Sequence, residues 1–334
     1  MGVSVRDVAA LAQVSVGTVS NVLNRPHLVS PETSARVLEA IDGLGFVRND
    51  AARQLRAGQS RALGMVVLDA ANPFFAELAR GAEDAAGERS LAVLLGNSGE
   101  DERREQTYLD MFEEQRVRGI LVTPVGNISG RARQLRERGI AVVLVDSTSE
   151  DEAVSSVSVD DVAGGRIAVD HLIERGCKRI AFLGGSLGIR QVEDRLDGAR
   201  QSANQAQEVT FTVIEAAGLS VEDGRQAAAQ LTEAKSAHRP DGVFAANDLL
   251  AVGFLQGLLM SGSLRVPEDL ALIGYDDIDF ASSTIVPLSS VRQPAHLIGR
   301  TAAEILIAES DGGSVSARHV IFQPELVVRA SSRR

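Results

Sequence analysis

With 334 residues, the chain is longer than one ordinary hydrophobic core requires and predicts two or three domains. Its 44% apolar residues are typical of a globular protein, and no stretch reaches the roughly 18 apolar residues that a membrane span needs. A net charge of −11 argues against a protein that coats nucleic acid along its whole surface.

The charge is unevenly placed. Up to Arg61 the chain carries seven arginines against five acidic residues, so a mildly basic head precedes an acidic body. The single cysteine, Cys177, excludes an internal disulfide, and the five histidines form no cluster with metal-ligand spacing. Arg6 and Asp7 interrupt any apolar run near the N-terminus, so we expect no export signal and a cytoplasmic protein without metal or cofactor.

Two short helices are predicted at the start of the chain. Apolar residues recur every three or four positions over residues 5–12, on a helix that Ser4 can cap and Asp7 can stabilise at its positive end. After a break at residues 13–15, a second amphipathic helix follows. The apolar positions of the two helices are Val5, Val8, Ala9, Ala12, Val19, Val22 and Leu23.

The second helix has an almost uncharged polar face. Gly17, Ser20, Asn21 and Asn24 lie opposite its apolar side. Short side chains that donate and accept hydrogen bonds, on an exposed helix beside a tight turn, suit a helix that enters the major groove of DNA. A surface helical hairpin of another function would show the same pattern, because two short amphipathic helices are common. The pattern alone therefore leaves both interpretations open.

A third helix is predicted after Ser30, where a capping residue, a proline and an acid follow one another. We expect Val37, Leu38 and Ile41 on its buried side, and its end at Gly43 and Gly45.

An alanine-rich, helix-prone segment follows at residues 49–57, capped by Asn49 and ended by Gly58. Nine residues are too few for a stable isolated helix, so this one should form only when something else holds it. Leu55 either enters a base step in the DNA minor groove or rests on the next domain as an ordinary linker leucine.

From residue 62 the pattern changes to short apolar runs that alternate with amphipathic stretches of helical length. Parallel sheets covered by helices on both faces are typical of this pattern. Irregular polar segments at residues 155–161 and 289–294 are expected to be crossings between two such sheets. The expected strands are 62–68, 91–95, 119–122, 140–145, 179–183, 211–214, 242–245 and 270–274, and the expected helices include 75–88, 102–117, 164–175 and 248–259.

Polar and aromatic side chains follow several of these strands, at the sheet edge where doubly wound folds bind ligands. Adjacent phenylalanines beside an amide could hold a sugar ring, and Asp, Arg and Asn side chains could bind its hydroxyls. Each residue alone is equally well explained as a helix cap, ordinary packing or a surface ion pair, so the prediction depends on their convergence. The candidates are Asn72, Phe74, Phe75, Asp146, Arg195, Asn247 with Asp248, and Asp276 with Asp277.

The N-terminal residues closely resemble the helix-turn-helix of the lactose-repressor (LacI/GalR) family of bacterial transcription regulators. The resemblance lies in residues 5–9 and 14–24, and it continues through 29–33 and 44–49. It implies a homodimeric, sequence-specific DNA-binding regulator, in most members a repressor, that binds a two-fold symmetric operator and inserts Leu55 into the central minor groove. From the residue types, we expect Val16 to contact a thymine methyl and Asn21 to bond adenine or phosphate. The predicted DNA-binding residues are Ser15, Val16, Gly17, Thr18, Ser20, Asn21, Asn24, Leu55 and Arg56.

The rest of the chain resembles the effector-binding domain of the same family, which is related to periplasmic sugar-binding proteins. The implied fold is α/β: an all-α helix-turn-helix domain and hinge helix, then two doubly wound α/β subdomains joined by three crossover strands, with the effector between them. The predicted boundaries are 1–47 for the DNA-binding domain, 48–61 for the hinge helix and linker, and 62–334 for the effector-binding and dimerisation domain, with one subdomain at 62–160 plus 293–320 and the other at 161–290 plus 321–331.

By resemblance, the effector is a sugar or sugar derivative. Many sugar-binding members have arginine where this chain has Ser147, so one hydroxyl clamp is missing, which argues against a plain pentose or hexose. No heptad segment follows the last strand, so we do not expect a coiled-coil tetramer. Whether the effector induces or co-represses stays open. The residues that match ligand-contact positions of the family are Phe74, Phe75, Arg195, Asn247 and Asp276, together with Asn72, Asp146 and Gln293.

One motif favours an enzyme instead. Residues 184–188 have the pattern G-x-S-x-G between a predicted strand and a helix, as in a hydrolase nucleophile elbow, and Asp276 and His296 follow Ser186 in the order of a catalytic triad. No His-Gly-Gly stretch precedes the motif, and any α/β sheet uses glycine-rich turns. We therefore expect a regulator without catalytic residues. A free periplasmic sugar-binding protein is disfavoured because no export signal is evident.

Overall fold

The structure is a computed structural model that describes residues 3–46, 60–185, 188–233, 239–312 and 316–333. These residues belong to two compact units, Met1–Gln59 and Ser60–Arg334, which we call the head unit and the body. The predicted hinge helix, with Leu55 and Arg56, lies outside the described residues, and so does Ser186.

The head unit contains the three predicted helices. The backbone N–H and the hydroxyl of Ser4 both donate to Asp7 Oδ2, at 2.8 and 2.7 Å, so Ser4 and Asp7 hold the start of the first helix as expected. Apolar side chains of all three helices form a small core around Val8, Val19 and Val37. The elements are α1 (Val5–Leu11), α2 (Val16–Asn24), the 3-10 turn η1 (Pro26–Leu28) and α3 (Pro31–Leu44).

The third helix differs from the prediction at two points. Leu38, expected inside, is 54% exposed, because the buried side of α3 runs through Val37 and Ala40, three positions apart. Gly43 lies within the helix, which ends only at Gly45. Gly45 has a φ of +60°, a conformation that glycine adopts at helix ends without steric cost.

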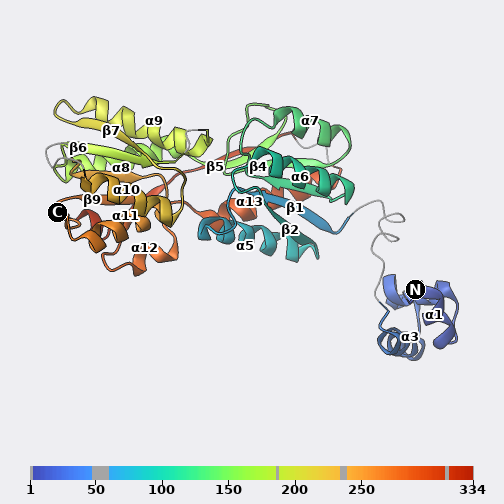
Figure 1. Cartoon of the computed structure of the whole chain (residues 1–334). Helices are drawn as coiled ribbons and strands as arrows, with labels where there is room; N and C mark the ends of the chain where they lie inside the picture. Colours follow the sequence, from blue (N-terminus) through green and yellow to red (C-terminus); the bar gives the residue numbers. More distant parts are fainter. Residues whose placement is uncertain (1–2, 47–59, 186–187, 234–238, 313–315, 334) are drawn as a thin grey trace. The chain divides into compact units, whose positions relative to one another are not determined.

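The body contains two six-stranded sheets, which lie in the blue-to-green and the yellow-to-orange halves of Figure 1. The first has the strand order β11-β5-β4-β3-β1-β2, and the second has the order β12-β10-β9-β8-β6-β7. Neighbouring strands pair in parallel, apart from the antiparallel pair β10–β12. Every expected strand is present. The strands are β1 (Ala62–Val67), β2 (Ala92–Asn97), β3 (Gly119–Val122), β4 (Ala141–Val145), β5 (Ser155–Val159), β6 (Arg179–Gly184), β7 (Thr210–Glu215), β8 (Gly242–Ala245), β9 (Ala271–Asp276), β10 (Ser289–Arg292), β11 (His319–Phe322) and β12 (Glu325–Val327).

Helices cover both faces of each sheet, which confirms the predicted α/β class. Met65 on β1 packs towards α5 and α13, whereas its neighbour Val66 packs towards α6 and α7. In the second sheet, Phe182 packs with α8 and α9, and Leu183 packs with α10 and α11. None of the described helices combines the length and the apolarity needed to cross a bilayer. The helices are α5 (Pro73–Glu88), α6 (Glu102–Glu114), α7 (Ser129–Glu137), α8 (Asp161–Glu174), α9 (Arg190–Gln205), α10 (Val221–Glu233), α11 (Asp248–Ser261), α12 (Asp279–Ser283) and α13 (Ala295–Ser310), with a 3-10 turn η3 (Ala330–Ser332).

The described chain passes between the two sheets at three places: from β5 to α8, from β10 to α13, and from β11 to β12. The polar segments at 155–161 and 289–294 therefore lie at crossings, as predicted. The expectation that they are irregular is wrong, because β5 and β10 are buried, paired strands. Serine hydroxyls make this possible by finding partners inside the fold: Ser156 bonds His319, and Ser290 bonds Asp248.

Candidate functional site

The tight turn between α1 and α2 is held by side-chain hydrogen bonds. Ser15 caps α2, because its Oγ accepts the N–H of Thr18 at 3.0 Å. The hydroxyls of Ser15 and Thr18 also lie 2.9 Å apart. Gln13, in the turn, has a φ of +53°. Two of the predicted DNA-binding residues therefore stabilise the turn that presents the others.

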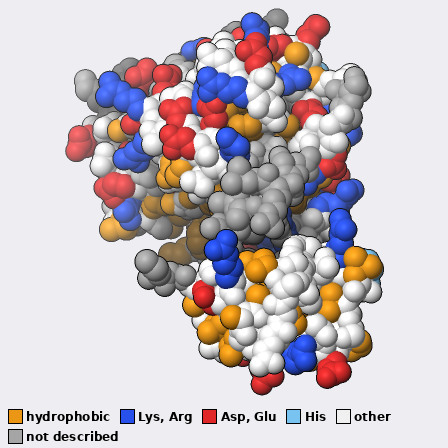
Figure 2. Space-filling model, turned by 90° about the vertical axis from the view of Figure 1, so that its right-hand side faces the viewer, with side chains coloured by type: hydrophobic (Ala, Val, Ile, Leu, Met, Phe, Trp, Pro, Cys, Tyr) orange, Lys and Arg blue, Asp and Glu red, His pale blue; other side chains and the backbone are white. Residues whose placement is uncertain are grey.

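The outer face of α2 presents uncharged side chains to solvent. Val16 is 42% exposed, and Gly17 and Asn21 are also exposed. The amide of Asn24 donates to the carbonyl oxygen of Ser20 at 2.9 Å, so it is engaged within the helix. In Figure 2 the head unit, at the bottom of the view, shows mostly uncharged side chains with few acids on the visible face. The uncharged outer face of α2 can approach base edges without electrostatic repulsion from the phosphates.

A second candidate site lies in the body, where the carboxyl ends of strands from both sheets meet. The first sheet and its connections contribute residues after β1, β2 and β4, and the second contributes residues from α9, after β7 and β8, and at the end of β9. We call this cavity the cleft. It has a volume of about 40 Å³. Its lining residues are Leu68, Phe74, Phe75, Glu100, Asp146, Ile189, Gln191, Val192, Arg195, Leu219, Asn247 and Asp276.

Asp276 is the centre of the polar contacts in the cleft. Gln293 donates to its Oδ1 at 2.8 Å, and Asn72 donates to its Oδ2 at 3.3 Å. Asn72 belongs to the first-sheet half and Asp276 to the second, so this bond joins the two halves. Asn72 also caps α5 by accepting the N–H of Phe74 at 3.0 Å, which places the rings of Phe74 and Phe75 edge to face, 5.0 Å apart, in the cleft wall.

Arg195 is the buried cation of the cleft. Its Nε donates to Asp161 Oδ1 at 2.7 Å, and its Nη1 donates to the carbonyl oxygen of Ala246 at 2.8 Å. Asp276 Oδ1 lies 3.9 Å from Nη1. The guanidinium lies 3.7 Å from the ring centre of Tyr275, in cation–π contact. These contacts fix the orientation of Arg195 from four directions.

Asp146 and Gln191 form a second bridge between the two halves. Gln191 Nε2 donates to the backbone oxygen of Asp146 at 2.6 Å and to its Oδ2 at 3.2 Å. Three acceptor atoms of buried residues, Asp146 Oδ1, Gln191 Oε1 and Gln293 Oε1, have no hydrogen-bond partner. Buried acceptors without donors are costly. Asp146 and Gln191 line the cleft, which thus offers acceptors to a molecule that brings donors.

Burial governs the charges of the cleft. It raises the pKa of Asp276 to about 6, although Arg195 opposes the shift. It also raises the pKa of Asp146 well above its ordinary value, and the carboxylate of Asp161 adds to the shift. Burial alone would lower the pKa of Arg195, but Asp161 and its neighbours hold it above the ordinary value. The cleft therefore holds one permanent cation, which is already paired with Asp161.

Asn247 contributes one atom to local structure and leaves its amide nitrogen for other contacts. Its Oδ1 caps α11 by accepting the N–H of Leu250 at 2.8 Å.

The backbone at the cleft edge is unusual, because Asp146 and Asp276 have positive φ values of 54° and 102°. Such conformations at a sheet edge are typical of functional sites.

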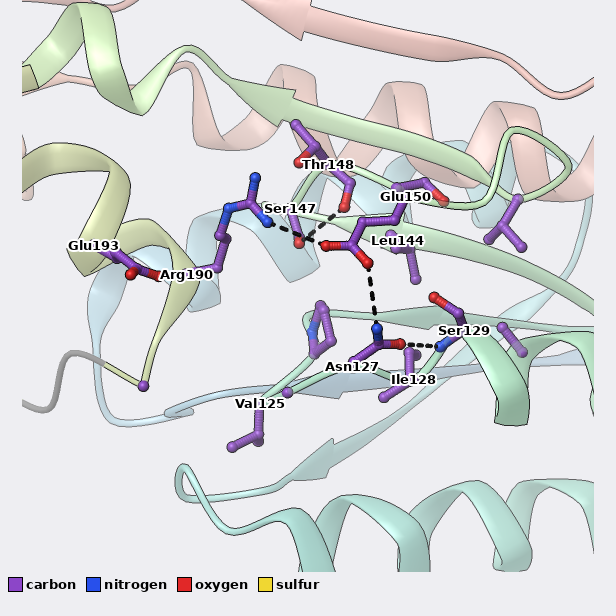
Figure 3. A pocket seen from close by; sticks show the side chains of 16 residues that line it. Val125, Asn127, Ile128, Ser129, Leu144, Ser147, Thr148, Glu150, Arg190 and Glu193 are labelled. Carbon is purple, nitrogen blue, oxygen red and sulfur yellow. Dashed lines mark hydrogen bonds and ion pairs between the residues drawn. The ribbon is translucent and has the colours of Figure 1, made fainter. Parts of the chain in front are cut away.

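Ser147 does not line the cleft. It lines a neighbouring cavity of about 200 Å³ between α7, the connection from β4 to β5, and the start of α9 (Figure 3). There Glu150 lies between Arg190, 3.6 Å away, and Asn127, whose amide donates to it at 3.3 Å. The residue that departs from the family pattern thus belongs to a different cavity from the residues predicted to bind the effector.

The structure brings together six of the eight predicted effector residues in the cleft lining, and the other two, Asn72 and Gln293, bond Asp276 behind it. Sequence reasoning missed Gln191, Asp161 and Tyr275. Gln191 could have been inferred from its position one helical turn before Arg195. Nothing in the local pattern distinguishes Asp161 from an ordinary helix-start acid.

The remaining members of the hydrolase triad are engaged elsewhere. His296 bonds Asp84 through Nε2 at 2.9 Å, on the exposed side of α13. Asp276 bonds Gln293 and Asn72. The described residues therefore give the triad no support.

Comparisons with known proteins give a family match in the head unit and another in the body. Residues 4–49 match the model of bacterial regulatory proteins of the lacI family, and residues 169–332 match a periplasmic-binding-protein-like domain. A ribose operon repressor of Bacillus subtilis (strain 168) is 37% identical over 91% of this chain and 90% of its own length.

Two solved structures extend the similarity. The lac repressor dimer bound to operator and the anti-inducer ONPF has a TM-score of 0.84 at 27% identity, and the similarity covers 100% of both chains. A LacI family transcriptional regulator from Enterococcus faecium with bound ribose has a TM-score of 0.74 at 27% identity over 81% of this chain and 98% of that one.

Proposed function

Because this chain belongs to the LacI family of bacterial regulatory proteins, we propose that it is a sequence-specific DNA-binding repressor whose operator affinity depends on a small effector bound in the cleft. The observation that carries this proposal is the pairing of two sites: an uncharged, exposed helix face in the head unit, and a buried polar cleft between two α/β halves in the body. The cleft alone would not distinguish a regulator from a free binding protein.

DNA is read by the outer face of α2. We assign Val16 to an apolar contact with a thymine methyl and Asn21 to a hydrogen bond with a base edge or phosphate, because both are exposed. Ser15, Thr18, Ser20 and Asn24 orient this face through the bonds described above. Leu55 and Arg56 are proposed to act in the minor groove from the hinge.

The effector is proposed to be a neutral sugar of the ribose type. The unpartnered acceptors of Asp146 and Gln191 call for a molecule rich in hydroxyl donors. Arg195 is already paired with Asp161, so its charge is not free to bind a phosphate or carboxylate. Ser147 lines the neighbouring cavity and not the cleft. That the lack of arginine at this position argues against a plain pentose stays a prediction, which D-ribose binding tests.

Effector binding is proposed to change the angle between the two halves of the body. The cleft of about 40 Å³ is far smaller than the roughly 300 to 1,000 Å³ of typical ligand pockets, so the two halves are proposed to separate to admit a sugar. Bound there, a sugar contacts residues of both halves and sets their separation. The hinge then transmits this change to the head units, with a coupling of about 1 to 3 kcal/mol.

The protein is proposed to act as a homodimer in the cytoplasm, where its operator lies, and without catalytic activity. Support for a second copy comes from apolar side chains on the surface around α11 and α12: Met260 is 82%, Phe280 56% and Ile285 89% exposed. Exposed groups of this size mark interaction surfaces. Sedimentation of the Phe280→Asp variant as a monomer, beside a dimeric parent, is the expected result, and an unchanged dimer would contradict this assignment.

Selection of random duplex DNA by the purified protein, at one moderate salt concentration, tests the proposal. Enrichment of a palindrome with a flexible pyrimidine–purine centre is expected. If no sequence is enriched, the selection is repeated with D-ribose and then with pooled purines, because a co-repressor is required by some regulators. Failure in all three conditions would contradict the repressor function, and an ester hydrolysis assay of the parent and the Ser186→Ala variant would then test the enzyme alternative.

A further inference from the structure

Two aspartates with buried carboxylates follow directly after two cleft residues and do not line the cleft themselves. Asp248 follows Asn247, and Asp277 follows Asp276. The carboxylate of Asp248 bonds Ser290, the carboxylate of Asp277 bonds Arg292, and both partners lie on β10. This strand leads to the second crossing between the sheets. The cleft loops of the second-sheet half are thus tied to the crossing strand.

Asp248 ties the crossing strand to the loop after β9. Its Oδ1 accepts the hydroxyl of Ser290 at 2.7 Å, and its Oδ2 accepts the N–H of Ile278 at 2.9 Å. The carboxylate lies so close to β9 that a Cβ on Gly274 would stand 2.0 Å from Oδ1. Only glycine at that position leaves room for the bond.

Asp277 bonds two arginines from separate segments. Arg292, the last residue of β10, donates to its Oδ2 at 2.7 Å, and Arg329, beyond β12, donates to its Oδ1 at 2.6 Å. The N–H of Asp277 donates to the hydroxyl of Ser290 at 3.0 Å. Ser290 therefore bonds both aspartates, and we call Asp248, Asp277 and Ser290 the hinge cluster.

The crossing strand continues directly into the other half of the cleft. One residue beyond β10, Gln293 bonds Asp276, and α13 then packs against α5. That contact is very close, because a Cβ on Gly299 of α13 would lie 1.8 Å from the backbone oxygen of Leu78 on α5. Since α5 begins at the cleft residues Phe74 and Phe75, a shift of β10 moves the opposite wall of the cleft.

We propose that the hinge cluster positions β10 relative to the cleft loops, so that a movement of Asp276 and Asn247 on effector binding is transmitted through β10 and α13 to the first-sheet half. The proposal rests on the proposed function. Asp248, Asp277 and Ser290 act as positioning residues and touch no effector. Without the Ser290 hydroxyl, Asp248 loses its bond to the crossing strand and the N–H of Asp277 loses its acceptor, whereas the pairing of β9 with β10 remains. Effector binding then sets the angle between the halves less effectively.

The matched pair Ser290→Ala and Ser289→Ala tests this role. Both hydroxyls are fully buried on the same strand, but Ser289 bonds Ser332 and Arg329 near the chain end and not the cleft loops. Each variant loses one buried hydroxyl, so both should lose similar stability. Only Ser290→Ala should lose the response to the effector.

The first measurement is operator affinity with and without saturating D-ribose, together with the affinity for D-ribose in the absence of DNA. The parent and Ser289→Ala should change operator affinity by the same factor, which typical coupling places at about 5- to 150-fold. In Ser290→Ala this factor should fall by about tenfold or to no effect, while D-ribose still binds within a factor of about three. An equal response of the two variants would overturn the inference.

Hydrogen exchange without sugar separates the inference from the proposed function. Ser290→Ala should exchange faster at residues 276–278 and in the first turns of α13 and α5, whereas Ser289→Ala should do so only at residues 329–332. A parent that binds operator but does not respond to D-ribose would contradict the proposed effector, and the exchange pattern would still decide the role of the hinge cluster. The same exchange pattern in Ser290→Ala and Ser289→Ala would overturn the proposed role of the hinge cluster.

Discussion

The head unit and the cleft present their functional side chains in opposite ways. In the head unit they come from one short helix and its turn and are mostly exposed, whereas in the cleft they come from separate strand ends, are buried and bond one another. A substitution on α2 should therefore change DNA binding with little effect on folding. A substitution in the cleft should change both, because residues that share a hydrogen-bond network do not contribute independently.

The largest expected effect is that of Arg195→Met. Methionine keeps much of the side-chain volume but leaves Asp161 and Asp276 without their cation, so the free energy of unfolding should fall by about 3 to 5 kcal/mol. D-ribose affinity should fall by about 100-fold or more, equivalent to about 3 kcal/mol. Denaturant titration and calorimetry measure the two quantities.

Arg200→Met on the same helix is the control for Arg195. Its side chain is 49% exposed and its ion pair with Asp197 is 3.8 Å long, so stability should change by less than about 0.5 kcal/mol. If Arg195→Met lowered the free energy of unfolding no more than Arg200→Met does, the buried cleft residue would contribute no more than an exposed one. The contrast between the cleft and the head unit would then be wrong.

Glu105→Gln tests how a buried carboxyl group affects stability at a site that does not bind the effector. Glu105 is a buried carboxyl outside the cleft, and its Oε2 accepts the N–H of Val125 at 2.8 Å, a bond that glutamine can keep. Burial raises the pKa of Glu105 from 4.5 to about 7, so the folded protein retains a proton that the unfolded chain loses. Stability therefore falls as the pH rises from 4.5 to about 7.

In Glu105→Gln this fall in stability with rising pH should be absent. It should match the parent near pH 4 and be more stable at pH 8 by up to roughly 3 kcal/mol, with unchanged D-ribose affinity. Denaturant titrations at the two pH values measure the difference. A stability difference that does not depend on pH would show that Glu105 is not a buried acid of this kind.

In the head unit, Asn21→Ala should weaken binding to the selected operator by about 1 to 3 kcal/mol. Binding to unrelated DNA and the free energy of unfolding should stay within about 0.5 kcal/mol of the parent, because the side chain is exposed. Asn24→Ala is the matched control and should have a smaller effect on operator binding, since its amide is already bonded to Ser20. Equal effects of the two variants would contradict the assignment of base contact to Asn21.

The smallest expected effect is the pH dependence of effector binding. The pKa of Asp276 is raised by burial to about 6, and a sugar hydroxyl bonds the ionised form more strongly. D-ribose affinity should therefore increase by about tenfold between pH 5 and pH 7. Calorimetry over this range measures it, and in Asp276→Asn the affinity should be weaker and depend less on pH.

The elements of both units could be predicted from the sequence because their signals are local. Caps, apolar periodicity and continuous apolar strands depend on neighbouring residues, and Ser4, Ser15 and Ser30 all cap the predicted helices. The error at Leu38 has a local origin too, since adjacent apolar residues on a helix leave open which of them faces the core.

The contacts within the cleft could not be predicted in the same way. Asp161 and Arg195 meet only because α8 and α9 pack together, and Gln191 meets Asp146 only across the two halves. Nor did composition show that the polar strand β10 is buried, since that depends on partners such as Asp248. Residue types at strand ends indicated where the cleft lies, but the partners of each side chain depend on the packing of distant segments.

The most direct test of the central claim is operator binding by the parent and by Arg195→Met, measured at equilibrium with increasing D-ribose. We predict that D-ribose changes operator affinity of the parent by about 5- to 150-fold and leaves that of Arg195→Met unchanged at the same concentrations, while both proteins recognise the same operator without sugar. A response of equal size in the two proteins would show that the effector acts outside the cleft and would contradict the account.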